Sequence, residues 1–465
     1  MRDIELPGST GIRFAARLQE RHQVVKVFGA SGAWWATGIG SRPSIQTILE
    51  LLYTDKGIGL NNYRHNVGGG RAGGPRADDK SGPDAWRAVP CPLQAEGTLA
   101  LAADAPAWEV LKKLVALGTV EDFTVFMNSP PESMTINGKT YGSGNGCNLR
   151  EDCYEAYAAF CADVTAAYIA AGVPVKYISP FNEPQSQWEA GWQEGCYFSM
   201  EQIFYISRLL VEKLRERQLP TKISINESAA LNREDYVFDF YRKLLADDTL
   251  YPYIDHFAGH SYHTSAEDKC RLYRYIQDTA HALGKAPLPI NQTEWAAWHQ
   301  YETLDDERRL VMTGRVLYED LTLLNVETWE YFAAVARGQD ALIVVKDQDP
   351  DWFMTTRHFW ALGNYSKFIK GYTRVGVDAP DAPDAPEGVL ASAYLSPDER
   401  QLVFVLVNET VHKQAVILEG MRPEQRGVAY ETSMQRTCDT PCAQIDGDGF
   451  YTLSPRSVTT VVFSM

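Results

Sequence analysis

REDCYEAYAAFCADVTAAYIAAGVPVKYISPFNEP, residues 150–184, carries two different periodicities within one short stretch. Over Arg150–Ala171 apolar residues recur every three or four positions, which predicts an amphipathic helix. Val175–Ser179 is then a short apolar run of the kind found in buried strands, and Asn182 and Glu183 follow it closely. The stretch therefore predicts a helix, a strand and polar side chains just beyond the carboxyl end of that strand.

The same alternation extends in both directions along the chain. Between the strand-like runs lie helical stretches such as Met200–Arg217 and Leu304–Leu324. The strand-like runs are Val24–Gly29, Gly59–Asn66, Asp122–Met127, Val175–Ser179, Lys222–Asn226, Ile254–His260, Leu288–Thr293 and Val326–Phe332. Eight strand–helix units in order predict an α/β fold of the (β/α)8 TIM-barrel type, whose active site lies at the carboxyl ends of the strands. The alternative is an open doubly wound sheet, but no Gly-x-Gly-x-x-Gly turn follows the first run.

The pattern changes after Gly363. Asp-Ala-Pro occurs three times over residues 378–386, which predicts a stiff acidic loop. Five alternating runs separated by turn residues then predict a C-terminal side β-sandwich, to which the N-terminal residues could add strands. These runs are Gly388–Leu395, Gln401–Asn408, Lys413–Leu418, Gly427–Thr432 and Ser457–Phe463. We expect an N-terminal segment over residues 1–23, the barrel over 24–365 and the side domain over 366–465.

Composition narrows the classes of function. With 44 Lys and Arg against 60 Asp and Glu, the net charge is −16, which disfavours nucleic acid as a partner. No run of about 18 apolar residues occurs, so no membrane span is expected. The first residues, Met1-Arg-Asp-Ile-Glu-Leu-Pro, lack the apolar core of a secretory signal. The expected location is cytoplasmic, or extracellular if a signal has been removed.

Eight cysteines are sparse for 465 residues, and no Cys-x-x-Cys pair is present, which argues against a zinc site. Most of them are expected to be free thiols. Two pairs are candidates for disulfides: Cys438–Cys442, which are close in sequence, and Cys147–Cys196, which fall in neighbouring loops after the third and fourth strands.

Two carboxylates occupy equivalent places at the predicted barrel rim. Glu183 follows the fourth strand, and Glu294, in Pro289-Ile-Asn-Gln-Thr-Glu-Trp295, ends the seventh. Both would therefore face the same end of the barrel. Glycoside hydrolysis uses such a pair, one carboxyl protonating the leaving oxygen while the other attacks the sugar or activates water. The mechanism needs neither cofactor nor metal, and none is expected.

Asn182-Glu183-Pro184 with a glutamate on strand seven resembles the clan A glycosidases, which are retaining enzymes. More narrowly, the chain resembles glycoside hydrolase family 30 over roughly residues 28–370. The matching stretches are Phe28-Gly-Ala-Ser-Gly, Tyr63-Arg-His-Asn-Val-Gly-Gly-Gly70, Asn128-Ser-Pro-Pro131 with Met134, Ser179-Pro-Phe-Asn-Glu-Pro-Gln185, Trp192-Gln-Glu-Gly-Cys196, His260-Ser-Tyr262 and Leu362-Gly-Asn-Tyr-Ser-Lys-Phe368. The resemblance implies that Glu183 is the acid/base and Glu294 the nucleophile.

The resemblance also implies roles for neighbouring residues. Asn182 would bond the sugar 2-hydroxyl, Tyr262 would lie beside Glu294, and Trp329 would form the floor under the −1 sugar. Arg64 would brace the nucleophile and keep it ionised, while the acid needs a raised pKa. Further substrate contacts are expected from Asn128, Trp188 and His260.

The substrate implied by the resemblance is a β-linked galactoside. Asn128-Ser-Pro-Pro, Arg-x-Asn-Val-Gly-Gly and Gln-Glu-Gly-Cys look most like the endo-β-1,6-galactanase branch, whereas glucosylceramidase-like members carry Trp at position 128. Thr293-Glu294-Trp295 departs from the Ser-Glu-Tyr of that branch. An exo-acting β-glucosidase, β-xylosidase or β-fucosidase, a xylanase and a β-1,6-glucanase stay open as alternatives. The non-enzyme alternative, a carbohydrate-binding protein on an inactive barrel, predicts loss of one carboxylate, yet both are present.

Other features are expected to be structural or subsidiary. Gly68-Gly69-Gly70, with Gly73-Gly74, reads as a flexible rim loop rather than a phosphate cradle, because no P-loop lysine follows. The spacing of His256, His260 and His263 matches no zinc pattern. Glu227 and Glu330 read as supporting carboxylates. The remaining loop tryptophans are candidate sugar platforms; they are Trp34, Trp35, Trp192 and Trp298.

Overall fold

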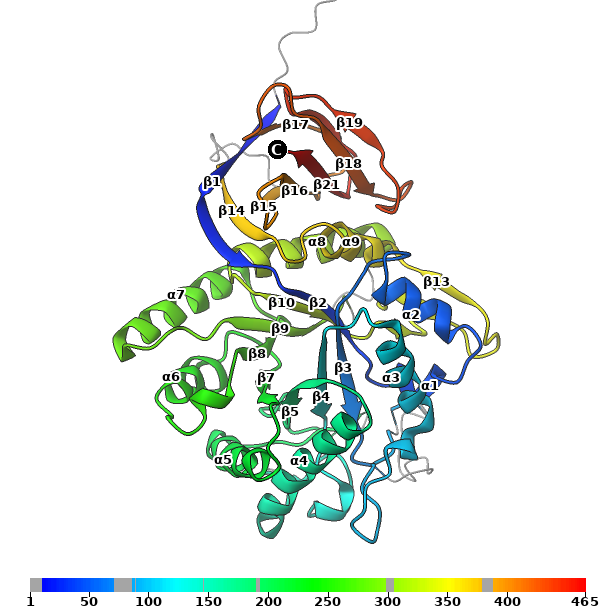
Figure 1. Cartoon of the computed structure of the whole chain (residues 1–465), viewed down its shortest axis with the longest axis vertical. Helices are drawn as coiled ribbons and strands as arrows, with labels where there is room; N and C mark the ends of the chain where they lie inside the picture. The colour runs from blue at the N-terminus through cyan, green and yellow to red at the C-terminus, as the bar shows by residue number, and fades with distance from the viewer. Residues whose placement is uncertain are drawn as a thin grey trace, which may run out of the picture.

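The computed structural model describes residues 11–70, 86–87, 89–144, 146–189, 193–297, 305–378 and 388–465. Two large sheets dominate this part of the chain, a parallel barrel and a mostly antiparallel sheet that caps one side of it (Figure 1). Gly73-Gly74, Trp192, Trp298 and nearly all of the Asp-Ala-Pro repeat lie outside the described residues.

The barrel sheet has the order β6-β5-β4-β3-β2-β10-β9-β8-β7. Its strands are β2 (Val27–Ser31), β3 (Asn62–Val67), β4 (Asp122–Met127), β5 (Val175–Ser179), β6 (Lys222–Ile223), β7 (Ile225–Ser228), β8 (Phe257–His260), β9 (Ile290–Trp295) and β10 (Thr328–Tyr331). The fifth predicted strand is present as two pieces, β6 and β7, separated by Ser224. Because β6 pairs with β5 and β7 pairs with β8, these consecutive pieces close the barrel. The predicted (β/α)8 architecture is confirmed.

Helices follow the strands and form the outer layer (Figure 1). They are α1 (Trp35–Ile39), α2 (Ile45–Tyr53), α3 (Ala105–Leu117), α4 (Tyr154–Ala170), α5 (Met200–Glu216), α6 (Phe240–Leu245), α7 (Ala266–Leu283), α8 (Asp306–Thr322) and α9 (Arg357–Ser366). Local sequence sets their ends: Ser199 and Ser265 begin α5 and α7 with capping boxes, and Gly118 and Gly284 end α3 and α7 in the left-handed region.

The side sheet has the order β19-β18-β21-β16-β15-β14-β1-β17-β20. Its strands are β1 (Ile12–Val24), β14 (Thr373–Asp378), β15 (Val389–Leu395), β16 (Gln401–Asn408), β17 (Gln414–Glu419), β18 (Gly427–Thr432), β19 (Ala443–Ile445), β20 (Phe450–Leu453) and β21 (Ser457–Ser464). The N-terminal residues do add a strand, since β1 pairs antiparallel with β14 and parallel with β17. A small third sheet joins β11 (Val335–Ala336), β12 (Ile343–Val345) and β13 (Phe353–Thr355).

Strand β16 joins the two hydrophobic cores. Val403, Val405 and Val407 belong to the barrel core, on the side of α8 and α9. Leu402, Phe404 and Leu406 belong to the separate core of the side domain. Successive side chains of a strand point to opposite faces, so one apolar strand can serve both layers. The side domain therefore rests on α8 and α9, as Figure 1 shows.

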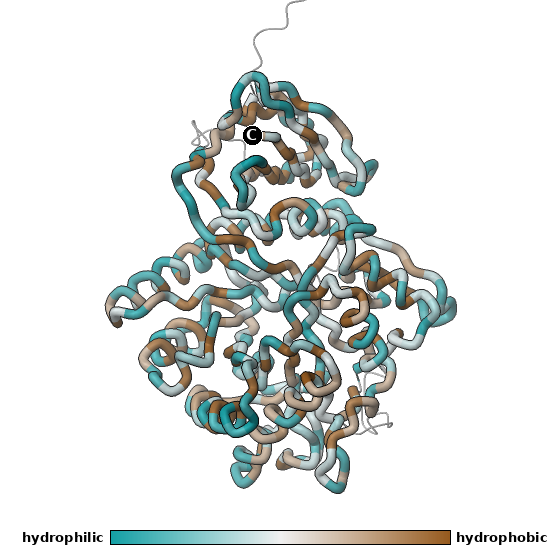
Figure 2. The backbone as a smooth tube through the Cα atoms, viewed as in Figure 1, coloured by the Kyte–Doolittle hydropathy of each residue, from teal (hydrophilic) through white to brown (hydrophobic). Residues whose placement is uncertain are grey.

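Hydropathy follows this layering. Figure 2 shows hydrophobic positions recurring along helices and strands, while hydrophilic positions gather on outer turns and loops. The barrel lumen differs, because charged side chains such as Arg64, Glu227 and Glu330 are buried there. None of the helices in the described ranges combines the length and the apolar character that crossing a membrane requires.

Candidate active site

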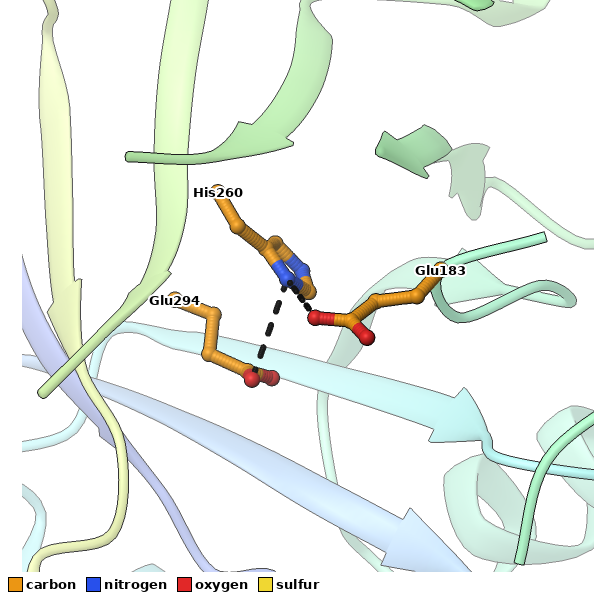
Figure 3. Close-up of side chains that lie close together, drawn as sticks. All are labelled: Glu183, His260 and Glu294. Atoms are coloured by element: carbon orange, nitrogen blue, oxygen red, sulfur yellow. Dashed lines mark hydrogen bonds and ion pairs between the residues drawn. The ribbon is translucent and has the colours of Figure 1, made fainter. Parts of the chain in front are cut away.

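The two glutamates singled out by the sequence lie at the same end of the barrel. Glu183 follows β5, and Glu294 lies within the last residues of β9. The side chain of Glu183 is 14% exposed, whereas that of Glu294 is 6% exposed. Figure 3 shows both carboxylates directed toward the imidazole of His260, the last residue of β8. The structure thus brings together three side chains from three separate strand ends.

Backbone strain accompanies the placement of Glu183. Its φ is 44°, and the φ of Glu227 is 63°, both in the left-handed region that non-glycine residues rarely adopt. The amide of Glu183 donates to the carbonyl of Glu227 at 2.9 Å, which ties the two strained positions together. Such positions cost roughly 1–3 kcal/mol each and persist where surrounding contacts over-determine them.

Arg64 on β3 links the residues around Glu294. It is fully buried, and its Nη1 donates to Oε2 of Glu294 at 2.8 Å. Nη2 donates to Oδ1 of Asn182 at 2.9 Å and lies 3.7 Å from Oε2 of Glu227. The guanidinium carbon also lies 3.7 Å from the ring centre of Phe126. Arg64 therefore lies beside Glu294, where the sequence placed it, and it also fixes Asn182.

Tyr262 donates its phenolic hydroxyl to Oε1 of Glu294 at 3.3 Å, so this expected neighbour is also beside the carboxylate. Burial and then Glu183 raise the pKa of Glu294, while the charges of His260 and Arg64 oppose that rise without reversing it. Arg64 acts in the expected direction, but it does not bring the pKa of Glu294 below its ordinary value.

His260 lies between the carboxylates as a cation. Its Nδ1 is 3.0 Å from Oε1 of Glu183 and 3.7 Å from Oε1 of Glu294, while Nε2 is 3.4 Å from Oε2 of Glu227. Burial alone would lower the pKa of His260, but these three carboxylates raise it to about 10. Glu183, His260 and Glu294 offer ligand atoms within 4.8 Å of one another.

Asn128 and Trp188 lie in the loops at this end of the barrel. Asn128 follows β4, is buried, and donates its amide to Oδ1 of Asn66 at 3.0 Å. Trp188 is half-buried, and its ring packs so closely on Gly195 that a Cβ there would lie 2.3 Å from the ring. Its buried indole nitrogen has no hydrogen-bond partner among the described residues.

Trp329 does not lie where the sequence analysis expected it. It is fully buried, and its indole nitrogen donates to Oδ2 of Asp320 on α8 at 2.9 Å. The side chain therefore occupies the layer between strand and helix, outside the barrel lumen. Its neighbour Glu330 faces the lumen, where the charges of Arg64 and Glu227 act on it. The expectation that Trp329 forms the sugar floor is wrong, because the strand alternation turns it outward.

By the same alternation Phe332, the residue after β10, falls on the side of the site; the sequence pattern gave it only as the end of a strand-like run and not as a site residue. Its amide donates to the carbonyl of Trp295, the residue after Glu294. Its ring packs edge-on against Trp34, with ring centres 5.1 Å apart. Trp34 thus lies at the rim, whereas Trp35 is fully buried and donates to the carbonyl of Ser31. Counting two positions on from the inward Glu330 would have indicated Phe332.

Other expectations have plain outcomes. All eight cysteines are free thiols, so neither candidate pair is bonded, although Cys196 is near enough to lower the pKa of the Cys147 thiol. Gly68 packs closely: a Cβ there would lie 2.2 Å from the Val89 carbonyl oxygen, so this part of the loop is not an open flexible segment. His256 bonds Ser224 below the site, and the structure does not gather the three histidines into a cluster.

Sequence comparison identifies a family and a relative. The sequence model of O-glycosyl hydrolase family 30 matches residues 11–344, a range that contains Glu183 and Glu294. An endo-β-1,6-galactanase of Hypocrea rufa is 28% identical over 228 residues, which are 43% of this chain and 46% of the relative. The alignment spans less than half of that relative's length.

Structure comparison gives matches over nearly the whole chain. A conserved exported protein from Bacteroides fragilis matches with a TM-score of 0.83 and 23% identity, covering 97% of this chain and 99% of the other. A family 30 subfamily 8 xylanase from Clostridium acetobutylicum matches with a TM-score of 0.72 and 21% identity, covering 97% and 100%. At these identities the two likenesses show a shared fold.

Proposed function

Because this chain belongs to O-glycosyl hydrolase family 30, we propose that it is a retaining enzyme acting on β-linked galactosides, with β-1,6-galactan or its oligosaccharides as substrate. The observation that carries the proposal is the pair of carboxylates, Glu183 and Glu294, which converge at one barrel rim around His260. Glu183 is the more exposed of the two and is proposed as the acid/base, while the buried, Arg64-bound Glu294 is proposed as the nucleophile.

The proposed reaction has two displacements. Glu294 attacks the anomeric carbon while Glu183 donates its proton to the departing glycosidic oxygen, which leaves a glycosyl ester on Glu294. Glu183, now ionised, removes a proton from water, and the resulting attack on the anomeric carbon releases Glu294. Two inversions give net retention of configuration.

Carboxylate spacing supports retention over inversion. An oxygen of Glu183 and an oxygen of Glu294 lie within 4.8 Å of each other. Retaining glycosidases hold their carboxyl groups about 5–5.5 Å apart, whereas inverting ones need about 6.5–9.5 Å to admit a water. A gap of this size matches the retaining arrangement, in which the second carboxylate itself is the nucleophile.

Several neighbours are proposed to hold the sugar. Asn182 accepts from Arg64 through Oδ1, and its amide nitrogen bonds no other described residue, so it can donate to the 2-hydroxyl. Tyr262 positions Glu294. Asn128 and Trp188 are proposed to contact sugars in neighbouring subsites. The edge-on pair Trp34 and Phe332 is proposed as the apolar surface beneath the −1 sugar, in place of Trp329.

The galactan assignment draws on the sequence of the relative and on two side chains beside Glu294. Thr293 stands where the galactanase branch has serine, and it keeps the hydroxyl group. This hydroxyl donates to Oε2 of Glu227, as a serine could. Trp295 is 1% exposed and packs against Trp329 and Tyr331, outside the lumen. Neither departure from the galactanase motif therefore brings a new group to the space above Glu294.

A substrate panel tests the proposal. Aryl β-galactoside, β-glucoside, β-fucoside and β-xyloside would be assayed beside β-1,6-galactan, with the first-formed anomer followed by proton NMR. We expect the highest kcat/KM on the galactoside, cleavage of the galactan, and a β-anomer as the first product. A first-formed α-anomer would contradict retention. Preference for a glucoside, fucoside or xyloside would favour an exo-glycosidase, and binding without hydrolysis by the folded protein would favour an inactive barrel.

A further inference from the structure

A third carboxylate, Glu227, lies directly beneath the proposed catalytic pair. It is fully buried on β7, and hydroxyl groups donate to both of its oxygens. Ser224 Oγ donates to Oε1 at 2.9 Å, and Thr293 Oγ1 donates to Oε2. Because the carboxylate is wholly enclosed, it cannot reach a substrate. The groups around Glu227 must therefore explain why its carboxylate stays charged although it is buried.

Two cations face the same carboxylate. Nη2 of Arg64 and Nε2 of His260 lie 3.7 Å and 3.4 Å from its Oε2. Burial would raise the pKa of Glu227, but the charge of Arg64, followed by the contacts of His260 and Thr293, holds it well below its usual range. Glu227 is therefore ionised at neutral pH.

The orientation of His260 depends on this anion. Its Nε2 faces Glu227, while its Nδ1 faces Glu183 at 3.0 Å, so both ring nitrogens have a carboxylate partner. A neutral imidazole carries one N–H and could donate to only one of them. Nδ1 is at hydrogen-bond distance from Glu183, whereas Nε2 faces Glu227 as an ion pair at 3.4 Å without hydrogen-bond geometry. Only the doubly protonated ring presents a proton and positive charge to both carboxylates at once.

We propose that Glu227 is a positioning residue for the acid/base, holding His260 as an imidazolium whose Nδ1–H is directed at Oε1 of Glu183. This assignment rests on the proposed role of Glu183. The donated hydrogen bond fixes the carboxyl plane of Glu183 and occupies Oε1, so that Oε2 is left to face the leaving group. Glu227 thus acts on leaving-group protonation through His260, and it touches neither substrate nor reacting atoms.

The charged groups around His260 come from every neighbouring strand and are included in this assignment. Glu183, Glu227 and Glu294 are the anions that face it. Arg64 is the cation beside Glu227, on the opposite side of the lumen from β8. Removing the charge of Glu227 would leave the proton on Nε2 without an anionic partner, which favours the neutral ring with a different hydrogen-bond pattern.

Nitrogen NMR on protein labelled with ¹⁵N-histidine tests the proton arrangement directly. The chain has nine histidines, and the signals of His260 would be assigned from the spectrum of His260→Gln. We expect both ring nitrogens of His260 to be protonated at pH 8 in the unmodified enzyme. In Glu227→Gln we expect one to lose its proton between pH 6 and pH 8. A neutral His260 at pH 8 in the unmodified enzyme overturns the proposal, even if no variant folds.

Kinetics test the consequence for catalysis. Because the effect passes through the acid/base, Glu227→Gln should lower kcat/KM by roughly 10²-fold for a natural leaving group and by less than about tenfold for an activated aryl glycoside. Equal losses on both substrates would indicate a structural role and overturn the proposal. Glu227→Asp, which keeps the charge, should recover part of the loss on the natural leaving group.

Glu330→Gln is the matched control. Glu330 is also a buried carboxyl of the lumen, but burial raises its pKa to about 8, so it is largely uncharged at neutral pH. Its replacement should leave His260 protonated and the ratio of the two activities unchanged. If NMR shows the predicted protonation but no glycoside is cleaved, the fault lies with the proposed function and not with the arrangement around His260.

Discussion

The barrel lumen has two adjacent layers that treat buried carboxyl groups in opposite ways. In the upper layer, Glu227 has Arg64 and His260 beside it, and its pKa is held well below the usual range. Glu330 lies one layer lower, level with Asn62, which is two residues before Arg64 on β3. Glu330 is equally buried, yet burial raises its pKa to about 8. Depth is therefore not what decides the charge of a carboxyl group here.

The decisive difference is the supply of donors. Glu227 receives hydroxyl groups from Ser224 and Thr293 in addition to two cations. Glu330 Oε2 has no hydrogen-bond partner among the described residues. A charge stays ionised in a low-dielectric interior only when it is paired and hydrogen-bonded. The upper layer thus keeps charges available at the strand ends, while Glu330 in the lower layer is largely uncharged at neutral pH.

The strongest test of the upper layer is Glu294→Ala. Removing a covalent nucleophile should lower activity by at least about 10⁴-fold. The space left on that face of the sugar should admit azide, while Glu183 still protonates the leaving group. With an aryl glycoside of the preferred sugar, azide should restore turnover and give a glycosyl azide of inverted configuration, identified by NMR. A folded variant that is inactive and yields no azide adduct would move the nucleophile elsewhere.

Glu183→Gln tests the second reactive carboxylate. A general acid contributes about 10²–10⁴-fold, and only poor leaving groups need its proton. We therefore expect a loss of that size on galactan oligosaccharides and a much smaller loss on an aryl glycoside with an activated leaving group. Steady-state kcat/KM for both substrates measures the ratio. Equal losses would show that Glu183 does not act as the acid.

Glu330→Gln tests the lower layer through its pH dependence. The folded-state pKa of Glu330, about 8, lies above its ordinary value of 4.5, so folding takes up a proton between these values. Its contribution to stability is fully present below pH 4.5 and is lost as pH rises toward 8. From pH 5 to pH 8 the free energy of unfolding of the unmodified protein should fall. In Glu330→Gln this fall should be about 3 kcal/mol smaller, as measured by urea unfolding at the two pH values. Parallel pH profiles would contradict the assignment.

Much of the fold was readable from sequence because its signals are local and repeated. The eight strand-like runs correspond to the barrel strands, and Glu183 and Glu294 lie at the strand ends where they were placed. Such predictions succeed because all the parallel strands of a barrel end at one rim. Residues at the carboxyl ends of different strands therefore lie close together, even when they are far apart in sequence. The contact of Arg64 with Glu294 was also expected, from family resemblance.

Contacts between distant layers could not be read in the same way. The convergence of Glu227, His260 and Ser224 depends on a strand that is split into β6 and β7, which no periodicity of the sequence indicates. The balance of pKa shifts at Glu294 depends on burial by loops whose course is set by tertiary packing. The prediction for Trp329 was wrong for a simpler reason. Adjacent residues of a barrel strand point alternately to the lumen and to the helices, so an error of one position places a side chain on the wrong face.

Trp329→Phe gives the smallest expected effect and tests that exchange. Phenylalanine keeps most of the ring but removes the indole donor to Asp320, which also bonds Ser261 and pairs with Lys269. Losing a hydrogen bond to a buried charged group should lower the free energy of unfolding by roughly 2 kcal/mol. Because Trp329 faces α8 and not the lumen, kcat/KM should change by less than about twofold.

Phe332→Ala is the matched comparison: it should lower kcat/KM by about tenfold, as expected when an aromatic contact is lost beneath a bound sugar. Urea unfolding and kinetics on the same aryl glycoside separate the two. If kcat/KM fell in Trp329→Phe as much as in Phe332→Ala, Trp329 and not Phe332 would be assigned the position beneath the sugar.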